Sequence, residues 1–89
     1  MKKFEIKVSG KVQGVFYRAN CQVMARKLGV KGFVRNETDG SVYIEAEGEE
    51  QNLVSFLDWC KKGSDQAQVE KLSHVESQPE GYNDFVIQQ

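Results

Sequence analysis

Apolar and polar residues alternate along the chain in several short segments, which is typical of strands that bury one face of a sheet. The clearest case begins near the N-terminus, where Phe4, Ile6 and Val8 alternate with polar residues. Further strands are predicted from apolar runs bounded by turn residues. The five predicted strands span residues 4–8, 30–36, 41–47, 66–75 and 83–88. An Asp-Gly turn at residues 37–40 joins the second to the third as a hairpin.

Two segments change to a helical period, with apolar residues at positions i, i+3, i+4 and i+7. The first helix begins near Tyr17 and carries this stripe at Cys21, Met24, Ala25 and Leu28. The second begins at residues 49–50 and carries it at Leu53, Phe56, Leu57 and Cys60. Each helix ends in two basic residues followed shortly by a glycine, a common C-terminal signal.

The order of elements is therefore βαββαβ with a short fifth strand. Two helices on one face of an antiparallel sheet would bury every apolar stripe at once. This predicts an α+β protein with the ferredoxin-like α/β sandwich arrangement. We expect residues 1–89 to form a single domain, because the chain shows no linker, repeat or low-complexity stretch.

Composition narrows the class of protein. Hydrophobic residues make up 39% of the 89 positions and charged residues 28%, as in ordinary globular domains. No apolar run approaches a membrane span, and the N-terminus turns polar too soon for a signal peptide. We therefore expect a cytoplasmic protein without a membrane partner. One histidine and two cysteines that form no CxxC pair make a bound metal unexpected.

The net charge of −1 hides an asymmetry. Residues 1–40 hold nine lysines and arginines against three acids, whereas residues 41–89 hold three against ten. A site for an anion would belong in the first half. The alternative is that the opposite charges only decorate two faces of the molecule, and charge alone favours that alternative.

The segment with the most chemical content joins the first strand to the first helix, at residues 12–18. A glycine-containing loop that leads into a helix presents several free backbone N–H groups, which together can bind an anion. Arg18 lies in the first helical turn, where a cation opposes the helix dipole unless an anion lies between them. Its planar guanidinium suits two phosphate oxygens. A plain glycine turn followed by a solvated arginine is the alternative.

Two longer motifs resemble the acylphosphatase family. The first is Val8-Ser9-Gly10-Lys11-Val12-Gln13-Gly14-Val15-Phe16-Tyr17-Arg18, and the second runs from Gly32-Phe33-Val34-Arg35-Asn36 through Gly40 to Gly48. Both occur in the family's order and spacing, and the resemblance covers nearly the whole chain. Tyr17 departs from it, because the family commonly has phenylalanine there. We expect its hydroxyl to lie near the loop, where it could shift substrate affinity.

The resemblance implies an enzyme that hydrolyses acyl phosphates, the mixed anhydrides of carboxylic and phosphoric acids. By position, Arg18 would bind the phosphate and Asn36 would orient the attacking water. The phosphate cradle would consist of the backbone amides of Gly14, Val15, Phe16, Tyr17 and Arg18. No cofactor is needed, and free phosphate or sulfate should inhibit. The physiological acyl group stays open among acetyl phosphate, carbamoyl phosphate and a glycolytic acyl phosphate.

Asn36 is well placed for this role, because the first two strands run parallel in the expected topology and end at the same edge of the sheet. Taken alone, it would be a turn asparagine that caps the hairpin. We interpret His74 as a structural or surface residue and Trp59 as a cover for the edge of the core. The acids Glu45, Glu47, Glu49 and Glu50 are interpreted as a solvated face.

Two other functions share this order of elements. Lys31-Gly32-Phe33 begins like the RNP1 motif of RNA-recognition modules. The next residues do not continue the motif, and it lies on the wrong strand, so no nucleic-acid partner is expected. The other alternative is a sensing or assembly domain with its site at a dimer interface, against which we expect a monomer. Cys21 and Cys60 are predicted to face each other or the core as free thiols near the site end of the helices, close enough to form a disulfide if oxidised.

Overall fold

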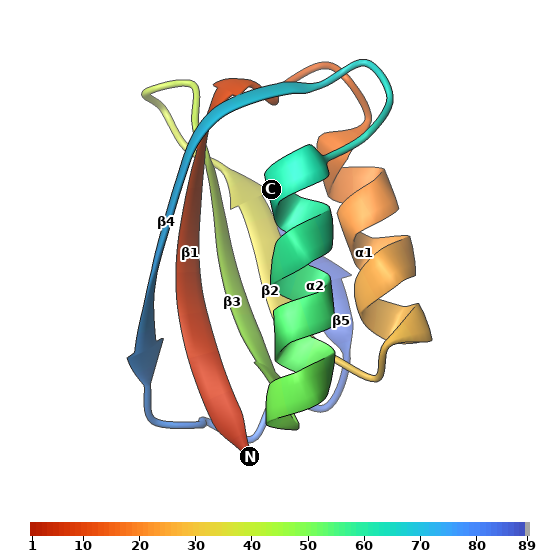
Figure 1. Ribbon diagram of the computed structural model, residues 1–89, viewed down its shortest axis with the longest axis vertical. Helices are drawn as coiled ribbons and strands as arrows, with labels where there is room; N and C mark the ends of the chain where they lie inside the picture. The colour runs from red at the N-terminus through yellow and green to blue at the C-terminus, as the bar shows by residue number, and fades with distance from the viewer. Residues whose placement is uncertain (89) are drawn as a thin grey trace.

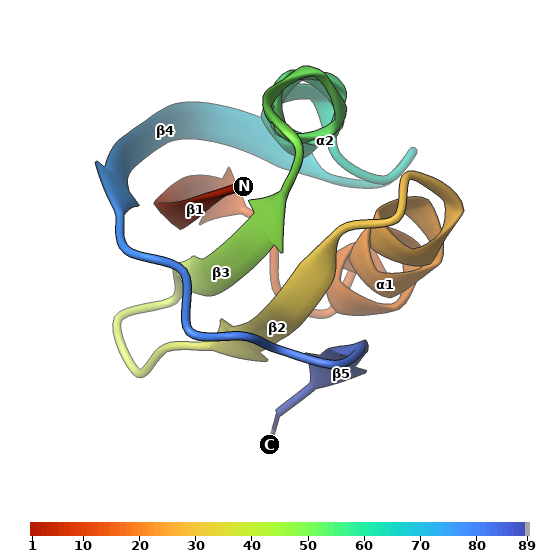
Figure 2. The same ribbon diagram turned by 90° about the horizontal axis from the view of Figure 1, so that it is seen from below.

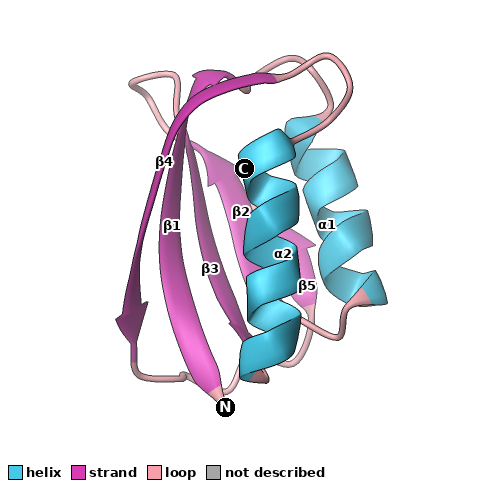
Figure 3. Cartoon of the chain, viewed as in Figure 1, coloured by secondary structure: helices cyan, strands magenta, loops and turns pink. Residues whose placement is uncertain are grey.

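A computed structural model describes residues 1–88 of the chain, and its elements follow the predicted order (Figures 1 and 3). The elements are β1 (Lys2–Lys11), α1 (Tyr17–Lys27), β2 (Lys31–Asn36), β3 (Val42–Gly48), α2 (Glu50–Lys62), β4 (Gln68–Ser77) and β5 (Phe85–Ile87). Both helices pack on one face of the five-stranded sheet, as Figure 2 shows from below. This confirms the predicted α+β ferredoxin-like arrangement.

The sheet is antiparallel as expected except at one edge, where the fifth strand makes it mixed. The strand order is β4-β1-β3-β2-β5, and β5 pairs in parallel with β2. β4 runs antiparallel to β1, so its last residues lie at the same end of the sheet as the first residues of β2. The chain then crosses under that end of the sheet to the opposite edge (Figure 2), and β5 therefore starts beside β2 in the same direction.

β1 is longer than the predicted strand, because Gly10 and Lys11 stay in the sheet rather than in the expected break. The pairing of β1 with β4 shifts register between Ser9 and Gly10. Gly10 has a φ of 122°, and a Cβ atom there would come within 2.3 Å of the Gln68 carbonyl oxygen. Only glycine fits this close approach of two backbones. The bulge lets β1 continue to the loop that precedes α1.

The core lies between the helices and the sheet and includes both cysteines. Cys21 of α1 and Cys60 of α2 are fully buried free thiols, as predicted. Burial, with a smaller contribution from the neighbouring Cys60, raises the pKa of the Cys21 thiol well above its ordinary value. The two cysteines therefore lie close together where the helices meet.

Tyr17 corrects one expectation about the loop. Its side chain is buried, and its hydroxyl donates a hydrogen bond to the Cys60 carbonyl oxygen at 2.8 Å. Its ring packs at 5.2 Å from the ring of Trp59, which covers the edge of the core as predicted. The hydroxyl therefore joins α1 to the end of α2 and points away from the loop, because the core offers it a buried acceptor.

The predicted solvated face of acids was wrong for Glu47 and Glu45. Glu47 is buried, and its carboxylate accepts hydrogen bonds from the backbone N–H groups of residues 80–82. Glu45 is partly buried beside Lys3, whose ammonium donates to it at 3.1 Å. The segment that crosses from β4 to β5 covers these residues. Glu49 and Glu50 remain exposed, as expected.

Candidate active site

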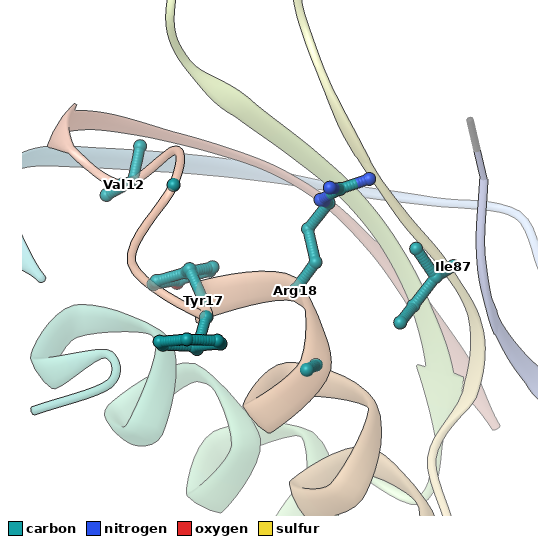
Figure 4. Close-up of a pocket in the computed structure, with 7 residues that line it drawn as sticks. Val12, Tyr17, Arg18 and Ile87 are labelled. Atoms are coloured by element: carbon teal, nitrogen blue, oxygen red, sulfur yellow. The ribbon is translucent and has the colours of Figure 1, made fainter. Parts of the chain in front are cut away.

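A cavity of about 310 Å³ opens at the junction of the loop after β1 with the start of α1 (Figure 4). Its lining consists of Val12, Gly14, Phe16, Tyr17, Arg18, Ala19 and Ile87. Six of these residues come from one short stretch of chain, and Ile87 comes from β5. The volume is within the range of sites for small molecules.

The loop and the first turn of α1 present a run of unpaired backbone N–H groups. Along α1, the first backbone N–H group that has a hydrogen bond is that of Asn20, which donates to the Phe16 carbonyl oxygen at 3.1 Å. Within residues 1–88, no backbone carbonyl accepts a hydrogen bond from the N–H groups of residues 14–19. These N–H groups and the positive end of the helix dipole favour an anion at this point.

The backbone bends sharply to bring these groups together. Gly14 has a φ of 74°, and Phe16, the residue before α1, has a φ of 64°. Glycine adopts this left-handed conformation readily, whereas a residue with a Cβ atom adopts it at a cost. Phe16 is nevertheless 69% exposed. Left-handed residues next to a helix start are typical of backbone nests, in which successive N–H groups bind one anion.

Arg18 provides the cation of the cavity. Its side chain is half-buried and extends from the first turn of α1 along the cavity wall (Figure 4). In the part of the chain that the structure describes, no carboxylate forms an ion pair with it. By contrast, Arg26 pairs with Asp84 at 3.0 Å and Arg35 pairs with Glu37 at 3.3 Å. The guanidinium of Arg18 is therefore available to an anionic ligand.

Two side chains that sequence reasoning missed hold the loop in place. The Gln13 amide donates hydrogen bonds to the carbonyl oxygens of Glu37 and Ser41, both at 2.9 Å. The Ser64 hydroxyl donates to the Val15 carbonyl oxygen at 2.7 Å. Gln13 joins the loop to the β2–β3 hairpin, and Ser64 joins it to the segment after α2. No local sequence pattern marks these partners, because they are separated by 24 to 49 positions.

Asn36 ends β2, at the same end of the sheet as the loop. β1 and β2 both pair antiparallel with β3, so they point the same way, as predicted. Asn36 lies two residues after Val34, which is buried under the helices, so its side chain is on the helix face. Its Oδ1 atom is buried without a hydrogen-bond partner among residues 1–88.

The predicted site residues fall into two groups in the structure. Gly14, Phe16, Tyr17 and Arg18 line the cavity, whereas Val15 is buried beside it and Asn36 is absent from the lining described for residues 1–88. His74 lies on β4, where its ring packs at 4.9 Å from that of Phe4, as the structural interpretation predicted. Over residues 1–88, no group of three or more His, Cys, Asp or Glu side chains could hold a metal ion.

Comparison with known proteins identifies the family. The model of the acylphosphatase family matches residues 4–87. An acylphosphatase from Thermotoga petrophila is 49% identical over 87 residues, which cover 98% of this chain and 97% of that protein. The chain belongs to the acylphosphatase family. Acylphosphatases are hydrolases that act on acyl phosphates, and this chain is an enzyme of that class.

Solved acylphosphatase structures have the same fold. The crystal structure of acylphosphatase from Bacillus subtilis superimposes with a TM-score of 0.98 at 41% identity, with both chains covered completely. An acylphosphatase from Coxiella burnetii gives a TM-score of 0.94 at 34% identity over 98% of this chain and 92% of its own. Family membership therefore favours the enzyme over the RNA-recognition and sensing alternatives. In residues 1–88, no helix is long and apolar enough to cross a membrane.

Proposed function

We propose that Arg18 and the backbone N–H groups of residues 14–18 hold the phosphoryl group of an acyl phosphate, and that Asn36 orients the water that attacks it. The cavity at the start of α1, where unpaired N–H groups and an unpaired guanidinium meet, carries this proposal. The planar guanidinium binds two phosphoryl oxygens, and the N–H groups bind the others. Both stabilise negative charge that spreads over these oxygens in the transition state.

Asn36 acts on water rather than on the phosphate. Its Oδ1 atom is buried without a protein partner within residues 1–88, and it can accept a hydrogen bond from a water molecule once the side chain turns toward the cavity. A water held there at the loop end of the sheet approaches the phosphorus from outside the cradle. The oxygen of this water forms the new bond to phosphorus while the bond to the carboxylate oxygen breaks. A phosphoryl oxygen of the substrate takes the water's proton.

The chemistry of the leaving group explains why so few side chains suffice. The carboxylic acid that forms has a pKa of roughly 4 to 5, similar to that of a glutamate side chain, so the carboxylate leaves without a proton. No general acid is required. Positioning and charge stabilisation by Arg18 and the loop then account for most of the catalysis. We propose that the reaction needs neither a metal nor another cofactor.

We also propose the conditions under which the enzyme works. Free phosphate or sulfate should occupy the cradle and inhibit competitively, because Arg18 and the N–H groups contact only phosphoryl oxygens. The cavity lies within one copy of the chain, which supports a monomeric enzyme with a small-molecule substrate and no nucleic-acid partner. A cytoplasmic location agrees with the two free thiols.

The test measures the hydrolysis of two substrates, each with and without a metal chelator. We expect the purified protein to hydrolyse benzoyl phosphate and to leave a phosphomonoester such as 4-nitrophenyl phosphate intact, because a phenolate leaves less readily than a carboxylate. Chelator should not reduce the rate, and inorganic phosphate should inhibit competitively. An Arg18→Ala variant should lose that inhibition. Equal inhibition of the variant would place the anion elsewhere, and loss of activity with chelator would contradict a metal-free reaction.

A further inference from the structure

Part of the cavity lining is apolar and offers no side-chain group that could bind a phosphoryl oxygen. Of the seven residues described in the lining, Arg18 alone is charged, and Phe16, Ala19 and Ile87 contribute apolar side chains. These side chains neither donate nor accept hydrogen bonds, so they cannot bind phosphoryl oxygens. The phosphoryl group needs only the N–H groups and the guanidinium. The apolar wall is therefore available to the other half of the substrate.

Phe16 is the first part of this wall. It combines two unfavourable features, because its backbone has a φ of 64° and its side chain is 69% exposed. A glycine would relieve the backbone strain, and a polar residue would suit the exposure. Strained residues of this kind often have a functional reason. An aromatic ring at the edge of the cavity offers a flat apolar surface to a ligand.

Ile87 is the second part, and β5 holds it firmly. Val34 of β2 is its register partner, and the Val34 carbonyl oxygen accepts a hydrogen bond from the Gln88 N–H at 2.9 Å. On the helix side, the Gln22 amide donates to the Phe85 carbonyl oxygen at 3.0 Å. Figure 4 shows Ile87 beside the Arg18 side chain. The short edge strand therefore brings an apolar side chain to the cation of the site.

We propose that Phe16 and Ile87 bind the acyl group of the substrate, and that the enzyme therefore prefers acyl phosphates whose acyl group is apolar, such as an aromatic or branched one. The proposal rests on the phosphate cradle proposed above. An acyl phosphate held by Arg18 carries its acyl group into the rest of the cavity, where these side chains lie. A second anionic group on the substrate would lose its hydration against this wall without gaining a cation.

The test is the ratio of kcat/KM for benzoyl phosphate to that for acetyl phosphate, measured in wild type and variants. A ratio within one variant cancels effects on the phosphoryl group, which the two substrates share. Ile87→Ala should lower the ratio about tenfold, because three carbons leave the apolar wall. Ile87→Val should lower it less, and Phe16→Ala should also lower it. Val86→Ala is the matched control, because the neighbouring Val86 points to the other face of β5.

Thermal melting and inhibition by inorganic phosphate complete the test. An Ile87→Ala variant that melts as a folded protein and binds phosphate with the wild-type inhibition constant, but has the lowered ratio, supports the acyl site. An equal loss of kcat/KM for both substrates, or the same change of the ratio in Val86→Ala, would overturn the proposed acyl site. Failure of the proposed function gives a different result: wild type would then hydrolyse neither substrate, or phosphate would not compete with them.

Discussion

At the scale of single residues, Arg18 and Asn36 differ in what they contact. Arg18 lines the cavity and has no ion pair in the described chain. We infer that it contacts the phosphoryl group in both the bound substrate and the transition state. Asn36 ends a neighbouring strand and has a buried, unpaired oxygen. We infer that it contacts only the water. The two roles predict different kinetic defects.

Substitution of each residue by alanine should separate these roles. Arg18→Ala should weaken phosphate inhibition and lower kcat together. Asn36→Ala should keep phosphate inhibition while kcat falls about a hundredfold or more, as for other single preorganised polar groups. Steady-state kinetics with benzoyl phosphate and phosphate inhibition measure both. Arg35→Ala is the control for losing an arginine, because Arg35 stacks on Tyr43, 4.8 Å from the ring centre, and pairs with Glu37 outside the cavity. A folded Asn36→Ala enzyme with near-normal kcat would remove Asn36 from the mechanism.

At the scale of elements, Gln13 links the loop that carries the N–H groups to the hairpin that follows Asn36. Its amide bridges two carbonyl oxygens of the hairpin, at Glu37 and Ser41. Because one side chain makes both bonds, a small movement of either element breaks the bridge. We infer that Gln13 is a positioning residue, which keeps the loop and the end of β2 in a fixed relative position.

The Gln13→Ala variant should show a loss of positioning rather than of binding. Removal of the amide takes away two hydrogen bonds, although the Glu37 and Ser41 carbonyl oxygens each keep one backbone N–H donor within the hairpin. The loss of two hydrogen bonds should cost about 1–3 kcal/mol of unfolding free energy. We expect kcat to fall several-fold, while the inhibition constant for phosphate changes less than kcat. Urea denaturation and steady-state kinetics measure the two effects. Gln78→Ala, on the exposed connection after β4, is the matched control. Loss of stability with unchanged kcat would assign Gln13 a purely structural role.

In the folded molecule, several surface acids are stabilised in their charged form by hydrogen bonds, some from neighbouring residues and some from distant ones. A hydrogen bond from the Ser41 side chain, followed by one from the Lys7 ammonium, lowers the pKa of Asp39 far below its ordinary value of 3.8. Hydrogen bonds also lower the pKa of Glu50, from Lys2, and of Asp84, from the Phe85 N–H. At the acidic pH values where these groups titrate, the unfolded chain therefore binds more protons than the folded chain. The free energy of unfolding consequently rises with pH there.

The direction of these pKa shifts predicts that the folded protein is less stable in acid. The stabilisation by these acids is complete above their unfolded pKa, near 4, and is lost as the pH falls through the lower folded values. The melting temperature should therefore drop below about pH 4. Circular dichroism melts from neutral to acidic pH measure the drop, and Asp39→Asn should make it shallower. If the melting temperature of the Asp39→Asn variant falls at acidic pH as steeply as that of wild type, the Asp39 contacts contribute nothing to folding.

Most of the fold, and the loop that lines the cavity, could be predicted from the sequence. The strands and helices follow from local periodicity, and the helix bounds at Tyr17 and Lys62 agree with the stripes of Cys21 and Cys60. The loop of free N–H groups was predictable because such groups before a helix depend only on neighbouring residues. The two motifs of the sequence, at residues 8–18 and 32–48, also identified the family. All of these properties lie within about ten to twenty consecutive residues, where a pattern in the sequence is a pattern in space.

Which distant residues meet depends on the path of the chain in three dimensions. The crossing from β4 to β5 places β5 parallel to β2, brings Ile87 into the cavity and covers Glu47 with backbone N–H donors. The packing of α1 on α2 turns the Tyr17 hydroxyl to the Cys60 carbonyl oxygen and away from the loop. These contacts join residues more than thirty positions apart. Periodicity shows which face of an element is apolar, whereas the path of the connecting chain selects the partner of that face.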